Sequence, residues 1–204
     1  MDAEWKDISG SSFSERDTAV LYAIEEEGLT VFTFDGLKRR LGMHPETLSR
    51  VLSRLEDQGI IEKTAAGYQV ASKANDFLKL RGLSTSKPKV PILQTVLSPN
   101  VPFQQIVSKL KGKWFGMLRW LGYSENEEGI TMKWITEDGA VQVEASFSEG
   151  ELSVEVKLLQ EKDFNVALKA SYQLIGYITR LYSTRIPVRN VAFSGSFDPY
   201  FTSA

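Results

Sequence analysis

The sequence of 204 residues contains no cysteine and a single histidine, His44. Without cysteine there are no disulfide bonds, no thiolate nucleophiles and no thiolate metal ligands. With one histidine there is no metal site built from several imidazoles and no catalytic pair of histidines. We therefore expect a protein that binds no metal ion and no cofactor.

Long hydrophobic runs are also missing. No stretch approaches the roughly eighteen unbroken apolar residues of a membrane-spanning helix. Residues 1–13 lack a basic start followed by an apolar run, so they do not look like a secretory signal and are predicted to be a flexible arm. These features predict a cytoplasmic protein with no membrane partner.

Acidic residues are absent from one part of the chain. The formal net charge is −2, yet residues 77–124 carry 8 basic and no acidic side chains. The overall charge does not indicate whether the partner is a nucleic acid. The uneven distribution of charge is compatible with a local basic surface. Lys109, Lys111 and Lys113 are candidates for extending a DNA-facing surface or for binding an anionic effector, and an ordinary solvated face is the alternative.

Helix, strand and turn signals follow one another at short intervals between residues 14 and 81. Serine and proline stand where helices begin, and glycine stands where they end. The predicted elements are a helix from Ser14 to Gly28, a strand at 30–34, a helix from Phe34 or Asp35 to Gly42, a helix from Pro45 to about Gln58, strands at 60–64 and 68–70 joined by a tight turn, and a short helix from Ser72 to Leu80.

The predicted helix from Pro45 to Gln58 has two chemically different faces. Its apolar residues follow the i, i+3, i+4, i+7 spacing of a buried stripe, namely Leu48, Val51, Leu52 and Leu55. Its other face carries short hydrogen-bonding side chains and guanidinium groups. A helix that reads the DNA major groove needs such a pair of faces, one to seat it and one to contact base edges.

Residues 34–63, FDGLKRRLGMHPETLSRVLSRLEDQGIIEK, resemble the winged helix-turn-helix domains of bacterial and archaeal transcription regulators, such as the MarR-like family. The shared pattern is a short helix, a glycine turn, a helix ending in Leu-Glu-x-x-Gly-Ile-Ile and a basic strand start. The resemblance covers residues 14–81, about a third of the chain. It implies sequence-specific binding of double-stranded DNA by a transcription regulator that is a homodimer and not an enzyme.

Ten residues of this module are candidates for contacts with DNA. Arg50 and Arg54 are placed for guanine edges or phosphates, the basic run 38–40 for the DNA backbone, and His44 for a phosphate or for capping the helix. The turn Ala65-Ala66-Gly67 is uncharged, so the wing offers little beyond Lys63. The candidates are Lys38, Arg39, Arg40, His44, Thr47, Ser49, Arg50, Ser53, Arg54 and Lys63.

A linker is predicted at residues 84–91, between a DNA-binding domain at 14–83 and a second domain at 92–204. The second domain is expected to dimerise or to bind an effector. Its predicted elements are a strand at 92–98, an amphipathic helix at 102–121, alternating strands near 130–134, 141–147 and 152–158, a helix from 164 to about 183 and a strand at 188–193. The expected fold class is α+β, with two helices on one face of an antiparallel sheet and solvent on the other.

No catalytic constellation stands out in the second domain. Glu144, Glu149, Glu151 and Glu155 are better explained by a solvated sheet face than by acid–base chemistry. Small and aromatic residues form a second stripe on the predicted helix 102–121 and suggest a dimer interface or a small-ligand pocket, with ordinary core packing as the alternative. These residues are Gly112, Gly116, Trp114, Phe115, Trp120 and Trp134.

Several alternatives stay open at this point. The N-terminal module is also compatible with a protein-interaction role within a larger nucleic-acid-processing assembly, with a C-terminal domain that binds a partner or a small ligand. A dimer is compatible with contacts through either helix, 102–121 or 163–183.

Overall fold

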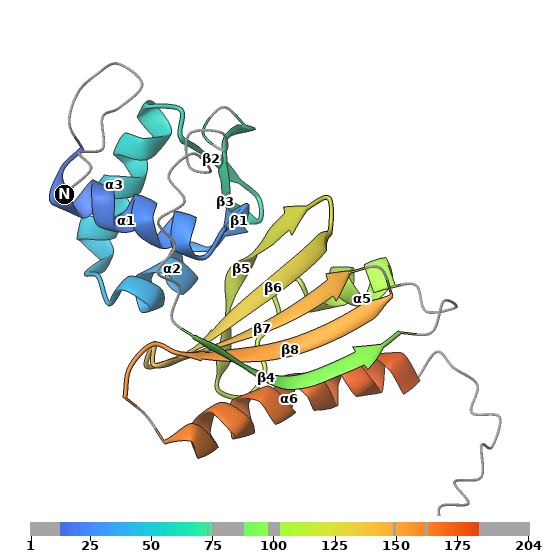
Figure 1. Cartoon of the computed structure of the whole chain (residues 1–204). Helices are drawn as coiled ribbons and strands as arrows, with labels where there is room; N and C mark the ends of the chain where they lie inside the picture. The colour runs from blue at the N-terminus through green and yellow to red at the C-terminus, as the bar shows by residue number, and fades with distance from the viewer. Residues whose placement is uncertain are drawn as a thin grey trace, which may run out of the picture.

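The computed structural model describes residues 13–72, 74, 88–97, 103–148, 150–161 and 163–183. Five helices and one antiparallel sheet of 8 strands make up this part of the chain, in the strand order β2-β3-β1-β5-β6-β7-β8-β4 (Figure 1). The elements are α1 (Glu15–Glu26), β1 (Val31–Phe32), α2 (Phe34–Leu41), α3 (Pro45–Asp57), β2 (Ile61–Thr64), β3 (Gly67–Val70), β4 (Lys89–Val96), α5 (Phe103–Leu110), β5 (Leu118–Asn126), β6 (Gly129–Thr136), β7 (Val141–Ser148), β8 (Glu151–Leu158) and α6 (Phe164–Ser183).

The three N-terminal helices begin and end where the sequence predicts. Ser14 and Asp17 form a capping box at the start of α1, and the Thr33 side chain accepts a hydrogen bond from the Gly36 amide at the start of α2. Gly42 ends α2 with a positive φ of 61°, a conformation that glycine adopts without steric cost. The helices and the β2–β3 hairpin share one apolar core around Phe32 and Leu52.

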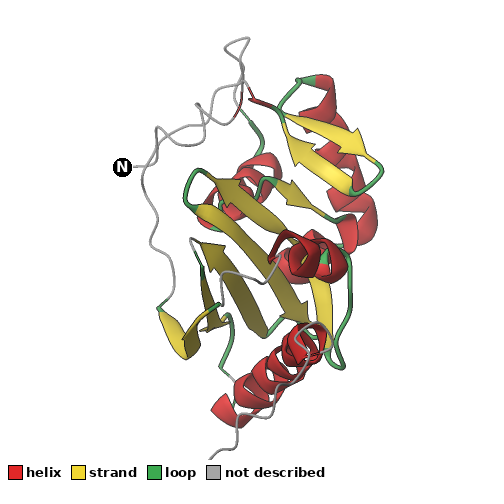
Figure 2. Ribbon diagram, turned by 90° about the vertical axis from the view of Figure 1, so that its right-hand side faces the viewer, coloured by secondary structure: helices red, strands yellow, loops and turns green. Residues whose placement is uncertain are grey.

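The C-terminal half places α5 and α6 on the same face of the sheet, as expected (Figure 2). Alternate residues of β6, β7 and β8 point toward these helices and are fully buried, among them Met132, Val143 and Val154. Ile106 of α5 and Leu174 of α6 complete the same core. The meander of β6, β7 and β8 and its turn at Gly139 confirm the strand prediction.

The predicted helix over residues 102–121 is wrong beyond Leu110. Helix α5 ends there, and the chain enters strand β5 at Leu118. Gly112 and Gly116 take φ values of 74° and 53°, which break the helix between these two points. The apolar spacing misled the prediction because Leu118 and Trp120 fit a strand alternation as well as a helical stripe.

One sheet runs through both halves, although the sequence predicts two domains joined by a linker. Strand β1 pairs with β5, with Phe32 opposite Gly122. Leu121 and Ile135 belong to the apolar core of the N-terminal helices. In the predicted linker, residues 89–91 form the start of β4, an edge strand that tolerates Pro91.

Glycine allows the two halves to approach closely at this junction. A Cβ atom on Gly36 of α2 would lie 2.6 Å from the Leu121 Cα and 2.8 Å from the Trp120 carbonyl oxygen. A Cβ atom on Gly122 would lie 2.8 Å from the Phe32 Cα. Neither distance is compatible with a side chain, so glycine at both positions is a condition of the junction.

The sheet face opposite α5 and α6 is not solvated at the junction, contrary to expectation. Lys133, Gln142, Glu144 and Lys157 project from this face and are buried. They meet acidic side chains at the end of α1 and a guanidinium group on α2, a set that we call the junction ion cluster. Its members are Glu26, Glu27, Arg40, Lys133, Gln142, Glu144 and Lys157.

Some predictions fall outside the described residues. These are the arm over residues 1–12, the strand at 188–193, the position of Glu149 and most of the short helix from Ser72 to Leu80. Among the described helices, none combines the length and the hydropathy that crossing a membrane requires.

Candidate nucleic-acid interface

Helix α3 presents the two faces that its sequence predicts. The side chains of the apolar stripe are at most 1% exposed, namely Leu48, Val51, Leu52 and Leu55. On the other side Ser49, Arg50 and Ser53 are exposed, as is Arg54, and Thr47 is half-buried. The helix lies in the N-terminal part of the molecule, away from α5 and α6 (Figure 1).

Two acidic side chains hold the guanidinium groups of this face. Arg54 Nη2 donates to Asp17 Oδ1 of α1 at 2.5 Å, and Arg50 Nη2 lies 2.5 Å from Glu46 Oε1 one turn earlier on α3. Burial raises the pKa of the Asp17 carboxyl, but hydrogen bonds from Arg54 and Ser14 bring it below the ordinary value. The contact with Asp17 anchors Arg54, whose side chain is 48% exposed. The pair of Arg50 with Glu46 lies at the surface.

A shallow polar groove of about 170 Å³ lies between α1 and α3. Arg16, Arg50 and Arg54 line it together with Thr47 and Glu46. Three guanidinium groups thus meet one acidic lining residue, Glu46. Such a concentration of cations suits a phosphate-bearing partner.

The basic run on α2 divides into three different environments. Lys38 Nζ lies 2.9 Å from Asp35 Oδ1, and Arg39 Nη1 donates to the Asp35 carbonyl oxygen at 3.0 Å. Arg40 instead reaches the junction ion cluster, where it binds Glu26 and Glu27 with its side chain only 14% exposed. The sequence predicts that Arg40 contacts DNA, but its charge is already compensated inside the molecule.

The remaining candidates of this module lie at the surface. His44 caps α3, its Nδ1 accepting a hydrogen bond from the Glu46 amide at 3.3 Å, in agreement with the capping interpretation. Lys63 is exposed on β2. The hairpin turn at Ala65 and Ala66 is exposed and held by the Thr64 hydroxyl.

The small and aromatic residues proposed for a ligand or a dimer separate into two groups. Phe115 and Trp134 are buried in the core beneath α5 and α6, with ring centroids 5.5 Å apart, so for them the core interpretation holds. Gly116 is a turn glycine that faces the Gln173 side chain of α6, and no helical stripe exists here. Gly112, Trp114 and Trp120 line an open groove of about 610 Å³.

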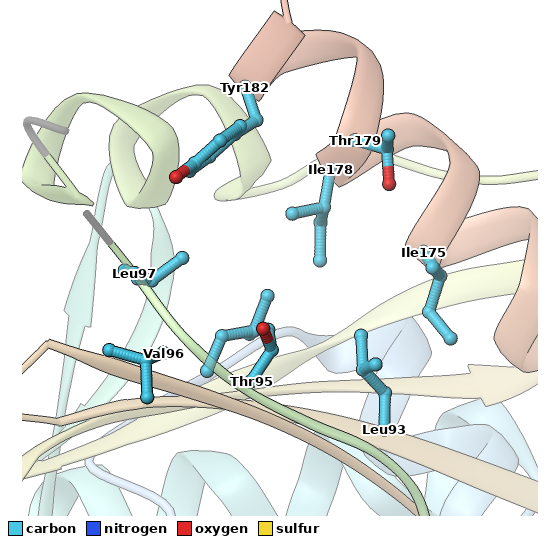
Figure 3. Close-up of a pocket in the computed structure, with 9 residues that line it drawn as sticks. Leu93, Thr95, Val96, Leu97, Ile175, Ile178, Thr179 and Tyr182 are labelled. Carbon is cyan, nitrogen blue, oxygen red and sulfur yellow. The ribbon is translucent and has the colours of Figure 1, made fainter. Parts of the chain in front are cut away.

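A third hollow lies between the edge strand β4 and helix α6 (Figure 3). Its volume is about 190 Å³, and its lining is mainly aliphatic, with Leu93 and Leu97 opposite Ile175 and Ile178. The hydroxyl groups of Thr95, Thr179 and Tyr182 are the polar groups among its lining side chains. No sequence pattern indicates that these residues line a pocket, because each fits an ordinary strand or helix pattern.

The junction ion cluster is the feature that sequence reasoning missed. Lys157 Nζ lies 2.9 Å from Glu27 Oε1 and 3.0 Å from Glu26 Oε1, and Gln142 Nε2 donates to Glu27 Oε2 at 2.6 Å. Burial raises the pKa of the Glu27 carboxyl, but Lys133, Gln142 and Lys157 lower it to about 2. Because the contacts of Gln142 and Lys157 with α1 span more than 100 residues, no local pattern indicates the cluster.

Within the described ranges, no three histidine or acidic side chains are grouped so that they would hold a metal ion. The carboxylates of the junction ion cluster are paired with Lys and Arg. Comparisons with models of protein families, with curated proteins and with solved structures found no match for this chain.

Proposed function

We propose that the N-terminal module is a winged helix-turn-helix that binds double-stranded DNA through α3 and that the protein is a transcription regulator. One observation carries the proposal. The hydroxyl and guanidinium face of α3 is exposed although the rest of the module is joined to the C-terminal half through β1, α1 and α2. A helix in this position can enter a major groove without rearrangement of the fold.

The arrangement of cations sets the expected strength of binding. Lys38, Arg39, Arg50, Arg54 and Lys63 remain as candidate phosphate or base contacts once Arg40 is assigned to the junction. If about four phosphates are neutralised per module, the logarithm of the binding constant falls with the logarithm of salt concentration with a slope near −4. A two-fold dimer would read half-sites about 34 Å apart.

Arg50→Ala is the variant that tests this proposal most directly, because the Arg50–Glu46 pair is exposed and contributes little to folding. Duplexes selected from random sequence with the full chain serve as ligands in a mobility-shift assay. We expect Arg50→Ala to weaken specific binding by ~1–3 kcal/mol. Lys169→Ala, an exposed change on α6, is the matched control and should bind like the parent chain.

Arg54→Ala is a second test, with a predicted complication. It removes the partner of Asp17, which is buried, so a loss of stability should accompany the loss of DNA binding. Thermal unfolding of the variant separates the two effects. If both arginine variants bind selected duplexes like the parent chain, α3 does not read DNA.

The paired state of the basic side chains favours a second candidate function, a protein-interaction module in a nucleic-acid-processing assembly. Arg50 and Arg54 each already bind a carboxylate, and the hairpin turn at Ala65 and Ala66 carries no charge. Absence of duplex binding at low salt, where electrostatic attraction is strongest, would support this candidate over DNA recognition.

A further inference from the structure

The groove of about 610 Å³ is built by both halves of the molecule. The N-terminal half contributes β1, the α2 residues Asp35 and Arg39, and the hairpin turn. The C-terminal half contributes the loop after α5, including Lys111 and Trp114, and strand β5. Its volume lies within the range of about 300–1,000 Å³ that is typical of small-molecule sites.

Aromatic side chains form one wall of this groove, which Trp114, Trp120 and Tyr123 line. Trp114 is 60% exposed, and the Arg119 guanidinium lies 4.9 Å from the centre of its ring. Trp120 is 6% exposed and makes an edge-to-face contact with Trp134 at 5.2 Å. An exposed tryptophan offers a flat surface on which another planar ring can stack.

Cationic groups stand beside this aromatic surface. Lys111 Nζ lies 4.1 Å above the ring of Tyr123, and within the described ranges no ion pair involves Lys111. Arg39 faces the groove from α2, anchored by the Asp35 carbonyl oxygen. Asp35 is the acidic lining residue, and Lys38 compensates its carboxylate at 2.9 Å. The groove therefore presents excess positive charge.

The turn of the β2–β3 hairpin forms one rim of the groove. Its residues Ala65 and Ala66 have the shortest side chains with a Cβ, so they leave the aromatic wall accessible. Lys111 directly precedes the helix-breaking Gly112, whose φ of 74° directs the chain out of α5, and Trp114 follows two residues later. The loop that carries the stacking ring and the cation thus comes from the acid-free segment noted in the sequence.

We propose that this groove binds a nucleotide, with the base stacked on Trp114 and a phosphate held by Lys111 and Arg39. A planar ring system next to an anionic group is the chemistry that an aromatic wall with adjacent cations recognises. Both a free nucleotide and an unpaired nucleotide of a nucleic-acid strand present this chemistry. The proposal is independent of DNA reading by α3, because none of the α3 residues lines the groove.

Binding measurements on the full chain test the proposal. ATP and AMP probe the free ligand, and a fluorescent single-stranded 12-mer and its duplex probe the nucleic acid. Titration calorimetry gives the affinities of the mononucleotides, and fluorescence anisotropy gives that of the oligonucleotides. We expect binding of at least one single-stranded or free ligand, weakened by fivefold or more, on the order of one lost stacking contact, in Trp114→Ala.

Matched variants separate stacking and charge from general surface changes. Trp114→Phe keeps a ring and should recover part of the affinity, whereas Lys111→Ala should weaken binding about as much as Trp114→Ala does. Tyr172→Ala and Lys169→Ala change an exposed aromatic and an exposed cation on α6 and should have no effect. Arg50→Ala should leave nucleotide binding intact, so failure of DNA reading by α3 and failure of this site are distinguishable.

Two results would overturn the assignment. One is the absence of binding of every nucleotide and single strand at low salt. The other is binding that persists unchanged in both Trp114→Ala and Lys111→Ala. Preference for ATP or AMP would identify the ligand as a free nucleotide, and preference for the 12-mer would identify it as an unpaired strand.

Discussion

At the junction of the two halves, strands β6, β7 and β8 bury side chains on both faces, but the two faces are chemically opposite. Toward α5 and α6 the strands present Met132, Val143 and Val154, which need only apolar neighbours. Toward α1 and α2 they present Lys133, Glu144 and Lys157, which need partners of opposite charge. Alternation of residue types identifies which side chains share a face, yet it does not reveal whether a polar face meets water.

Charge balance explains how the polar face tolerates burial. Glu26, Glu27 and Glu144 supply three negative charges, and Arg40, Lys133 and Lys157 supply three positive ones. Lys157 meets its carboxylate partners only when α1 is docked on the sheet, whereas Glu144 is also paired within the sheet by Lys133 and Lys89. Buried ion pairs add little net stability, but removal of one partner leaves an uncompensated charge at high cost. The junction is therefore expected to form as a unit or not at all.

Lys157→Met should destabilise the buried polar face more than the other variants described below. It keeps much of the side-chain volume but removes the ammonium group between Glu26 and Glu27, leaving excess negative charge in the cluster. We expect a loss of about 3–5 kcal/mol in the free energy of unfolding, measured by urea denaturation. Lys169→Met, an exposed change on α6, should stay within about 0.5 kcal/mol. Equal stability of the two variants would refute the structural role of the cluster.

Lowering the pH should reduce the stability that the buried polar face contributes and should leave the contribution of the apolar face unchanged. The pKa of Glu27 is about 2, below its ordinary value of 4.5, so its ionised form stabilises the folded state. This stabilisation, on the order of 3 kcal/mol, is complete above pH 4.5 and is lost as the pH falls toward 2. Glu144, whose pKa is also lowered by Lys133 and Lys89 against the effect of burial, adds a loss of the same sign.

Urea denaturation at a series of pH values between 6 and 2 measures this effect. In Glu27→Gln the acid-dependent part of the stability should shrink, because the titrating group is gone. A parent chain and a Glu27→Gln variant with the same pH dependence would show that other carboxylates dominate.

Gly122→Ala should weaken the pairing of β1 with β5, which joins the two halves of the sheet. The expected loss of stability is intermediate between those of the other variants. Its Cβ atom would meet the backbone of β1 at Val31 and Phe32, so β1 and β5 would have to separate. We expect a destabilisation of about 1–3 kcal/mol by thermal unfolding. Gly176→Ala on α6 is the matched control: nothing lies within 4 Å of its Cβ, and alanine should stabilise that helix by about 0.5–1 kcal/mol.

Local signals account for the part of the fold that the sequence predicts. The Ser14 cap, the proline at the first position of α3 and the glycine at Gly42 act over a few residues, so the start of α1, the start of α3 and the end of α2 follow from them. The strand β5 was not predicted because Leu118 and Trp120 satisfy both periodicities. The joined sheet was not predicted because the pairing of Phe32 with Gly122 spans a long stretch of chain.

The candidate sites also contain residues that local patterns predict and residues that only long-range contacts bring together. The exposed and buried faces of α3 follow from helical spacing, so the sequence places Ser49, Arg50 and Ser53 correctly at the surface. Arg40 is different, since Lys38 and Arg39 contact Asp35 on the same helix whereas the partners of Arg40 come from the end of α1. The aromatic groove combines residues of two halves, and no pattern within either half indicates that they meet.

Glu46→Gln should have the smallest effect on stability and therefore sharpens the contrast between exposed and buried ion pairs. The Glu46–Arg50 pair joins atoms 2.5 Å apart, as close as any pair in the junction, but both side chains are largely in water. Solvent screening makes such a pair worth little, and Glu46 adds a modest interaction with the N-terminus of α3, so the loss should stay below about 1 kcal/mol. Removal of this negative charge should also strengthen duplex binding severalfold, because Glu46 lies on the face proposed to approach phosphates. A destabilisation as large as that of Lys157→Met would mean that distance, and not burial, decides the value of these ion pairs.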